Sequence, residues 1–200
     1  MQHLTPILWS LPWVLPPAVV LFRARHSLSL SDVPDAPPPD APRVSVVVPA
    51  RNESRNIERC ARSVLAAAYP DFEVVVVDDH STDGTGDIAR RIARDEARLR
   101  VVDAPPLPEG WFGKQWACAT GARESSGELL LFTDADTRHS PDLLPRAVNA
   151  MRARGAELLS VAGNQEMHSF WERIVQPQMF ALLSIRYGGS EHVSNAKRPV

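Results

Sequence analysis

The sequence contains few of the residues from which disulfide frameworks and zinc sites are built. Cys60 and Cys118 are its only cysteines, and neither belongs to a CxxC motif or to a Cys/His cluster. This scarcity argues against a disulfide-stapled extracellular module and against a structural zinc domain. It favours a reducing compartment.

The chain also lacks an excess of positive charge. Lys and Arg together number 22 against 24 Asp and Glu, which gives a formal net charge of −2 at pH 7. The arginines of one later segment alternate with acidic residues instead of forming a basic stripe; they are Arg51, Arg55, Arg59 and Arg62. Proteins that bind nucleic acid usually carry such a stripe, so nucleic acid is not an expected partner.

Charge is missing altogether from one long stretch, Leu4 to Phe22. A helix needs roughly 20 apolar residues to cross the hydrocarbon core of a bilayer, and this stretch comes close to that length. Its two tryptophans suit a membrane interface, and Arg23 and Arg25 follow it directly. We therefore expect a membrane anchor over residues 1–26, with the remaining domain on the cytoplasmic side of the cell membrane.

Two other interpretations of this stretch stay open. A signal peptide carries positive charge ahead of its apolar run, whereas Met1 to His3 contain no Lys or Arg, which disfavours that interpretation. A hairpin on the membrane surface is the second, because prolines interrupt helices. The stretch contains Pro6, Pro12, Pro16 and Pro17.

The composition changes twice after the apolar stretch. Residues 27–43 are rich in Ser, Asp and Pro, a composition that favours extended backbone over a packed core, so we interpret them as a linker. From Val44 onward, short β-branched runs alternate with amphipathic segments. That pattern is typical of βα repeats around a parallel sheet, and it predicts one α/β domain over residues 44–200.

The apolar runs predict strands, and the segments between them predict helices. Strands that are buried on both faces are hydrophobic throughout, as Val74–Val77 is. The expected strands are Val44–Val48, Glu73–Val77, Leu99–Val102, Leu129–Phe132 and Leu158–Val161. The expected helices are Asn56–Ala68, Thr85–Ala97, Lys114–Ser125 and Pro141–Arg154.

The last part of the domain carries further helix signals. Ser140 is the expected N-cap of the helix that follows it, and Gly155 is its expected stop. Phe170–Tyr187 has apolar residues at helical spacing despite Pro177. This helix either packs on the sheet or lies in a membrane interface and admits a lipid acceptor.

Polar side chains follow three of the expected strands at the point where each strand ends. Ligands of open α/β sheets bind at the carboxyl ends of the strands, and a 3-2-1-4 strand order brings these ends together. Carboxylates crowded there repel one another unless a cation is present, and oxygen ligands without His or Cys favour Mg²⁺ or Mn²⁺. The alternative is that the Asp pairs only cap turns. The acids concerned are Glu53, Asp78, Asp79, Asp134 and Asp136.

These motifs resemble those of the family 2 glycosyltransferases of GT-A fold. The similarity covers Val44 to Asp87, VSVVVPARNESRNIERCARSVLAAAYPDFEVVVVDDHSTDGTGD, and the later Asp134-Ala135-Asp136. Pro105 to Ala122, PPLPEGWFGKQWACATGA, is further similar to the subgroup of carotenoid and hopene-associated glycosyltransferases. The resemblance implies a Rossmann-like GT-A nucleotide-sugar-binding fold with a mostly parallel sheet, here preceded by one N-terminal membrane helix.

The resemblance also implies which residues contact the nucleoside of the donor. Arg51 and Glu53 are expected beside the nucleoside. Asp79, together with Asp78, is expected to accept a hydrogen bond from the base. Both pairs directly follow expected strands of the sheet.

A second group of residues is implied for the diphosphate and the metal. Asp134 is expected to contact ribose and metal, and Asp136 to ligate the Mg²⁺ or Mn²⁺ that holds the diphosphate. Lys114 is expected to offset phosphate charge, or else to be a solvated residue that opens a helix. Trp111 and Phe112, with Trp116, line the sugar or acceptor pocket or simply pack under their loop.

The function implied is that of a metal-dependent, inverting glycosyltransferase. It moves a sugar from a nucleotide diphosphate donor to a lipid or isoprenoid-type acceptor at a membrane. Family members carry the catalytic base on a later helix, which is not found before Val200, so we expect an N-terminal fragment that is incomplete at its C-terminus. One alternative is therefore a nucleotide-sugar-binding fragment without turnover.

A haloacid-dehalogenase-like phosphatase is a minor alternative. Such enzymes also place an Asp-x-Asp after an apolar strand and bind Mg²⁺. Their pattern requires Thr or Val two positions after the second Asp, where this chain has Arg138. They also place that strand first, whereas here it is expected fourth.

Overall fold

The computed structural model describes residues 14, 18, 29–163, 165–167 and 169–187, which belong to two compact units. One unit is Leu30–Glu157 and contains the sheet. The other contains helix α6 (Phe170–Tyr187). The anchor expected over residues 1–26 lies outside the described residues, apart from Val14 and Ala18. Within the described part of the chain, no helix combines the length and apolar character needed to span a bilayer.

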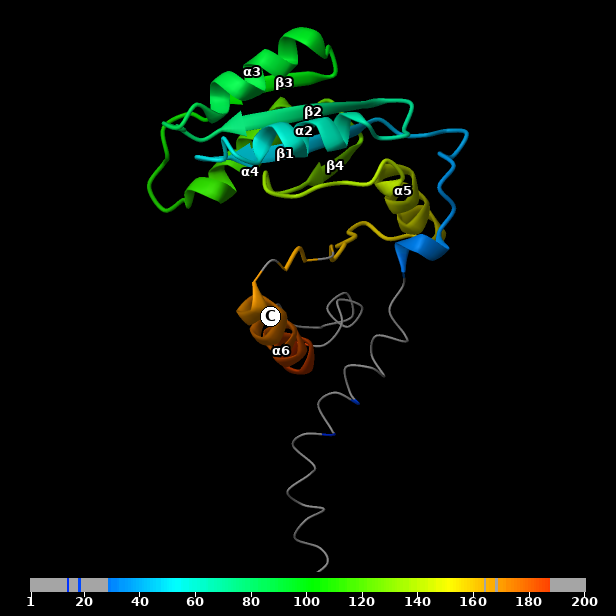
Figure 1. Ribbon diagram of the computed structural model, residues 1–200. Helices are drawn as coiled ribbons and strands as arrows, with labels where there is room; N and C mark the ends of the chain where they lie inside the picture. The colour runs from blue at the N-terminus through cyan, green and yellow to red at the C-terminus, as the bar shows by residue number, and fades with distance from the viewer. Residues whose placement is uncertain (1–13, 15–17, 19–28, 164, 168, 188–200) are drawn as a thin grey trace, which may run out of the picture. The chain divides into compact units, whose positions relative to one another are not determined.

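A parallel sheet of 4 strands, in the order β3-β2-β1-β4, forms the centre of the larger unit (Figure 1). The expected 3-2-1-4 order is confirmed. Because all pairs are parallel, the carboxyl ends of the strands meet at one edge. The strands are β1 (Val44–Ala50), β2 (Phe72–Asp78), β3 (Leu99–Asp103) and β4 (Leu129–Phe132).

Four helices and a short 3-10 helix surround this sheet. Helices α2 and α3 cover one face and α4 covers the other, as Figure 1 shows. The expected helices therefore exist, with ends shifted by a few residues. Their bounds are η1 (Leu30–Asp32), α2 (Ile57–Leu65), α3 (Thr85–Asp95), α4 (Gly113–Glu124) and α5 (Leu143–Arg154).

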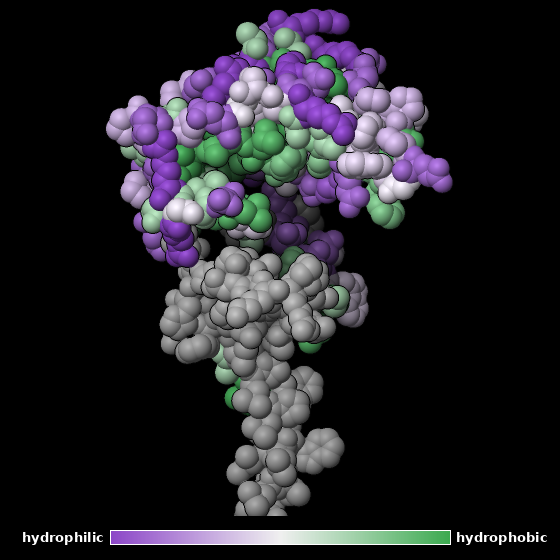
Figure 2. Space-filling view, turned by 180° about the vertical axis from the view of Figure 1, so that it is seen from behind, coloured by the Kyte–Doolittle hydropathy of each residue, from purple (hydrophilic) through white to green (hydrophobic). Residues whose placement is uncertain are grey.

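Strand β4 pairs only with β1 among the described strands, and it leaves apolar side chains open to solvent. Leu130 is 44% exposed and Phe132 is 51% exposed. On the face of Leu30–Glu157 that Figure 2 shows, mostly hydrophilic residues surround a hydrophobic area in the middle of the view.

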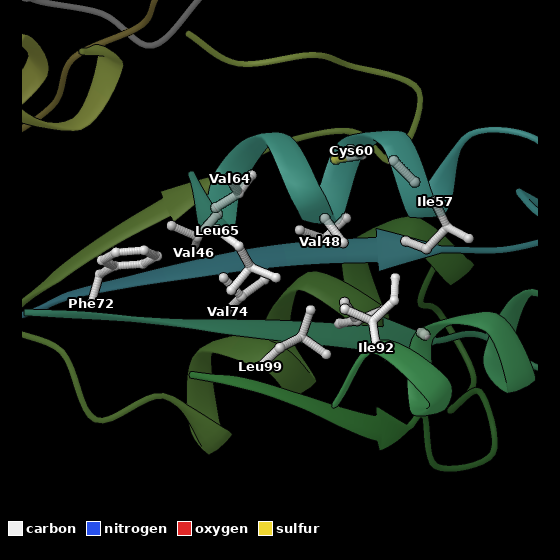
Figure 3. Packing of buried hydrophobic residues seen from close by; sticks show 14 of the residues in the cluster. Val46, Val48, Ile57, Cys60, Val64, Leu65, Phe72, Val74, Ile92 and Leu99 are labelled. Carbon is white, nitrogen blue, oxygen red and sulfur yellow. The ribbon is translucent and has the colours of Figure 1, made fainter. Parts of the chain in front are cut away.

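The largest core cluster lies between the sheet and helices α2 and α3. Val46 and Val48 of β1 point to this face, and Ile57 of α2 and Ile92 of α3 pack against them (Figure 3). On the opposite face, Val47 belongs to a smaller cluster closed by α4. Alternate residues of β1 are thus buried on both sides, which explains why its sequence is a continuous apolar run.

Two expectations about the later segments are wrong. Leu158–Val161 is not a strand: it belongs to the smaller unit, and Leu158 is 88% exposed. Helix α5 begins at Leu143 rather than Pro141, and Asp142 rather than the expected Ser140 is its N-cap residue. Pro141 and Asp142 form a turn whose acidic side chain is held by Arg146. Gly155 ends this helix as expected, with φ of 56°.

The segment expected as a linker runs along α5. Arg146 of α5 donates to the carbonyls of Leu30, Ser31 and Val33. Arg152 pairs with Asp40 farther along the same segment. These bonds hold the backbone ahead of β1 against a helix of the sheet unit.

Helix α6 matches its expected bounds. Ser169 and Glu172 form a reciprocal cap at its start, with each side chain accepting from the other residue's backbone N–H, at 3.1 and 3.2 Å. Apolar side chains along it are exposed, Trp171 by 70%.

Candidate functional site

The loops that follow β1 and β2 are joined by hydrogen bonds. Asn52 Oδ1 accepts from Thr82 N at 2.9 Å, and Ser81 Oγ accepts from Asn52 N at 3.1 Å. Asn52 and His80 both have φ of 56°, a left-handed conformation that is uncommon outside glycine. Such strain is maintained where the surroundings fix it, and it is often found near functional sites.

A second set of bonds continues this junction toward α3. Asp83 accepts from Ser54 N at 3.0 Å, and Thr85 Oγ1 accepts from Glu53 N at 2.8 Å. The hydrogen bond from the Thr85 hydroxyl, followed by the one from the Ser54 backbone, holds the pKa of Asp83 well below its usual range. The start of α3 therefore fixes the position of Glu53.

Asp79 is buried directly after β2, between the Arg51 guanidinium and the His80 imidazole. Its Oδ2 lies 3.4 Å from Arg51 Nη1, and its Oδ1 lies 3.3 Å from His80 Nδ1. Gly113 closes over the carboxylate, since a Cβ at that position would be 2.8 Å from Asp79 Oδ2. A larger residue at this position would have to displace the Asp79 carboxylate or the start of α4.

Asp78 faces away from Asp79 although the two are adjacent in the chain. Its Oδ1 accepts from Ser81 N at 3.1 Å, and its Oδ2 points at Gly86 of α3. The structure therefore places Asp78 in the turn after β2. This is the turn-capping role that the sequence left open for it.

A cleft of about 470 Å³ opens at the carboxyl edge of the sheet. Apart from Asp78, the residues predicted for donor and metal all line it, whereas Trp111, Phe112 and Trp116 do not. Its walls come from the β1 loop, the end of β2, the start of α4 and the segment after β4. The predicted residues lining it are Arg51, Glu53, Asp79, Lys114, Asp134 and Asp136.

An ion pair spans the cleft between α4 and β4. Lys114 Nζ lies 2.6 Å from Asp134 Oδ1, and this hydrogen bond raises the pKa of Lys114. Both side chains are more than half exposed, so water screens the pair. Glu53 is held on the other side by Asn56 Nδ2 at 2.8 Å.

Asp134 and Asp136 are exposed, whereas Ala135 between them is buried. Among the residues described, no three or more His, Cys, Asp or Glu gather into a set that could hold a metal. Mg²⁺ typically takes only one or two carboxylates and completes its shell with water and phosphate oxygens. The side chains present thus fit a cation shared with a diphosphate rather than a closed metal cage.

The aromatic residues beside α4 divide between packing and exposure. Trp111 and Trp116 stack edge to face with ring centroids 5.2 Å apart, and Trp116 Nε1 donates to Pro105 O at 3.0 Å. Phe112 is 73% exposed directly before Gly113 of the cleft. Trp116 is therefore part of the loop's own packing, and Phe112 remains available to a ligand.

Three polar residues next to the cleft had no assigned role in the sequence. Thr133, Thr137 and His139 lie within hydrogen-bonding distance of one another behind the Asp134–Asp136 segment. Thr133 and Thr137 are four positions apart and Thr137 and His139 two, but the segment is neither helix nor strand, so these spacings do not predict their contact. Only the turn after β4 brings them together.

The sequence profile of Glycosyl transferase family 2 matches residues 45–193. Glycosyltransferase AglE of Haloferax volcanii is 36% identical over 127 residues, which is 62% of this chain and 40% of that protein. The 4,4'-diaponeurosporenoate glycosyltransferase of Staphylococcus haemolyticus is 29% identical over 146 residues, 71% of this chain and 37% of that protein. The chain thus spans less than half the length of these relatives.

Solved structures of proteins in complex with nucleotide sugars also resemble this chain. The mannosyltransferase PcManGT from Pyrobaculum calidifontis, in complex with GDP-Man and Mn²⁺, aligns with a TM-score of 0.56 and 33% identity, covering 72% of this chain and 42% of that one. TarS 1-349 of S. aureus, in complex with UDP-GlcNAc, aligns with a TM-score of 0.50 and 28% identity, covering 65% of this chain and 38% of that one.

Proposed function

The chain belongs to glycosyl transferase family 2, and from that premise we propose that its cleft binds a nucleoside diphosphate sugar together with Mg²⁺ or Mn²⁺. The whole protein then transfers the sugar to an acceptor hydroxyl. The position of the Asp-x-Asp segment after the fourth strand and the family membership both argue against the phosphatase alternative.

One observation carries this proposal: the convergence of two different kinds of polar group on one cleft. Arg51 and the buried Asp79 form one wall, and the exposed Asp134 and Asp136 form another. A volume of about 470 Å³ is within the range of roughly 300–1,000 Å³ that is typical of small-molecule sites. The first wall suits a nucleoside and the second suits a cation with its diphosphate.

Each residue of the cleft has a proposed task. Asp79 accepts a hydrogen bond from the base, while Arg51 fixes its carboxylate and lies beside the nucleoside with Glu53. Asp134 and Asp136 hold the cation, which when bound stabilises the negative charge that builds on the leaving diphosphate. Lys114 adds a positive charge next to the phosphates.

The transfer that we propose is a single displacement with inversion. The acceptor oxygen forms a bond to the anomeric carbon as the bond from that carbon to the diphosphate oxygen breaks. The hydroxyl proton passes to a general base, a role for which we propose no residue of this chain.

For the acceptor we propose a lipid or an isoprenoid-type molecule, taken up by a membrane-bound protein whose sheet unit is cytoplasmic. The name of one relative, 4,4'-diaponeurosporenoate glycosyltransferase, supports an acceptor of this class. The uncharged stretch Leu4–Phe22 and the exposed ring of Phe112 beside the cleft agree with a membrane-associated substrate.

Calorimetric titration of the full chain with GDP and UDP, with and without Mn²⁺, tests donor binding. We expect Mn²⁺ to strengthen the binding of at least one nucleotide, and Asp136→Ala to remove that gain. Asp95→Ala removes an exposed carboxylate far from the cleft and serves as the matched control. Unchanged Mn²⁺ dependence in Asp136→Ala would show that the assignment is wrong.

A further inference from the structure

A row of polar side chains behind the Asp134–Asp136 segment is not used by the proposed function. His139 Nε2 lies 2.9 Å from Thr133 Oγ1 and 3.1 Å from Thr137 Oγ1, and the two hydroxyl oxygens are 2.8 Å apart. Thr133 directly precedes the segment, and Thr137 directly follows it. One imidazole nitrogen therefore contacts both ends of the segment whose carboxylates face the cleft.

The hydrogens available determine the direction of these bonds. Thr137 Oγ1 donates to the Asp134 carbonyl at 2.7 Å, which uses the single hydrogen of that hydroxyl. The Thr133 hydroxyl must then donate to Thr137 Oγ1, and its own oxygen accepts from His139 Nε2–H. An unprotonated Nε2 would take the Thr133 hydrogen and leave the 2.8 Å contact between the hydroxyls without one.

The result is a directed chain of three donors. It runs from His139 Nε2–H to Thr133, from Thr133 to Thr137, and from Thr137 to the Asp134 carbonyl. Burial lowers the pKa of His139, which favours the neutral ring. The directions of the hydrogen bonds then assign its one ring hydrogen to Nε2. Thr133 itself is buried, where an unpaired hydroxyl would be costly.

Helix α2 fixes both ends of this chain. His139 N donates to Ser63 Oγ at 3.0 Å, and that hydroxyl donates to Cys60 O at 2.7 Å. Cys60 Sγ donates to Asp134 O at 3.5 Å. The backbone of His139 and the Asp134 carbonyl that ends the hydrogen-bond chain are thus both held by side chains of α2.

We infer that His139 is a positioning residue for the segment that holds the cation and the diphosphate. Through Thr133 and Thr137 it fixes the peptide that joins Asp134 to Ala135, and so the direction in which the carboxylates of Asp134 and Asp136 face the cleft. The inference rests on the proposed function, because it assigns a task to the same site. His139 contacts neither donor nor cation and acts only through the two threonines.

The test compares variants of His139 that differ in whether their side chain carries a hydrogen-bond donor. His139→Leu keeps the volume and removes the N–H, whereas His139→Gln keeps an amide N–H at a comparable distance from the backbone. In calorimetric titration of the full chain with GDP or UDP, we expect His139→Leu to reduce the gain from Mn²⁺ about tenfold, the effect of one lost buried hydrogen bond. We expect metal-free nucleotide binding to stay unchanged, and His139→Gln to recover most of the gain.

A second pair of variants tests the hydrogen-bond chain at the Thr133 hydroxyl in its middle. Thr133→Val is isosteric but has no hydroxyl, and Thr133→Ser retains it. We expect Thr133→Val to behave like His139→Leu, and the double variant to lose no more than either single one, because each breaks the same chain. Thr133→Ser is expected to resemble wild type, and this pair keeps the test decisive if His139→Leu does not fold.

The outcomes separate the inference from the proposed function. A Mn²⁺ gain that is the same in wild type, His139→Leu and Thr133→Val would overturn the inference and leave donor binding intact. Additive losses in the double variant would overturn it as well. Absence of any Mn²⁺ gain in wild type would overturn the proposed function and the inference together.

Discussion

Lys114 Nζ and Asp134 Oδ1 are 2.6 Å apart, so a residue at the start of α4 is paired with the first carboxylate after β4. The pair neutralises one of the two carboxylates proposed to hold the cation. A diphosphate in the cleft would offer Lys114 a second anionic partner. When a donor binds, we therefore expect the Lys114 ammonium to turn from the Asp134 carboxylate toward the diphosphate.

The first prediction concerns Lys114. Lys114→Ala is expected to weaken GDP or UDP binding by roughly 5–20-fold, the loss of one partly exposed charge-assisted hydrogen bond, and to leave guanosine or uridine binding unchanged. Calorimetry with the nucleoside and the nucleotide measures both. Arg94→Ala, which removes an exposed cation on α3, is the control. Equal losses for nucleoside and nucleotide would contradict a phosphate contact.

The second prediction concerns Gly113. A Cβ there would lie 2.8 Å from Asp79 Oδ2, so Gly113→Ala must displace either the carboxylate or the start of α4. We expect nucleoside binding to weaken about tenfold, since either displacement changes the cleft beside the carboxylate proposed to bind the base. Gly163→Ala adds its Cβ in open space and is the control. Wild-type nucleoside affinity in Gly113→Ala would exclude Asp79 from that role.

The third prediction is a pH dependence set by Glu73. Burial raises the pKa of this carboxyl, but hydrogen bonds from Ser45 and Ser126, with Arg100, outweigh burial and hold the pKa at about 2. The folded pKa is thus below the unfolded value of about 4.3. The stability it contributes, on the order of 2 kcal/mol, is complete above that value and is lost as the pH falls toward 2.

Urea unfolding between pH 6 and pH 2.5 measures this dependence. Glu73→Gln is expected to be less stable than wild type at pH 6, and the difference is expected to shrink as the pH falls. Glu109→Gln, which changes an exposed carboxyl, should keep the wild-type dependence. A difference between Glu73→Gln and wild type that stays constant across this range would argue against a depressed pKa.

The fourth prediction concerns the segment ahead of β1. Arg146 donates to the carbonyls of Leu30, Ser31 and Val33, and only 18% of its side chain is exposed. Arg146→Ala is expected to lower the free energy of unfolding by about 1–3 kcal/mol and to admit proteolysis within residues 30–43. Limited digestion with a non-specific protease followed by mass spectrometry maps the cuts, with Arg94→Ala as the reference. Cleavage no faster than in that reference would mean that the segment is held by other contacts.

The sequence predicts the strand order and most of the cleft because both follow from local pattern. Strands buried on two faces must be apolar throughout, and β1 and β2 are. The same rule wrongly predicts a strand at Leu158–Val161, because a short apolar sequence is the same whether or not a neighbouring strand pairs with it. Burial, which pattern cannot measure, separates the two cases.

The site shows a similar division at the level of single residues. Asp78 and Asp79 are both chemically suited to a ligand, but successive side chains at a strand end point to opposite faces. One enters the turn toward Gly86 and the other enters the cleft toward Gly113. His139 escapes prediction for another reason: its contacts with Thr133 and Thr137 depend on a turn and on Ser63 of a distant helix.

The bonds from α5 to residues 30–40 have a mechanical consequence. Tension applied to the chain ahead of Leu30 would first load Arg146 and Arg152, and through them a helix, before it reached the hydrogen bonds of β1. Strand β1 is one of the two inner strands of the sheet, and Arg51 and Glu53 follow its carboxyl end. We therefore expect the bonds of Arg146 and Arg152 to limit how far a force on the N-terminal part of the chain distorts the cleft.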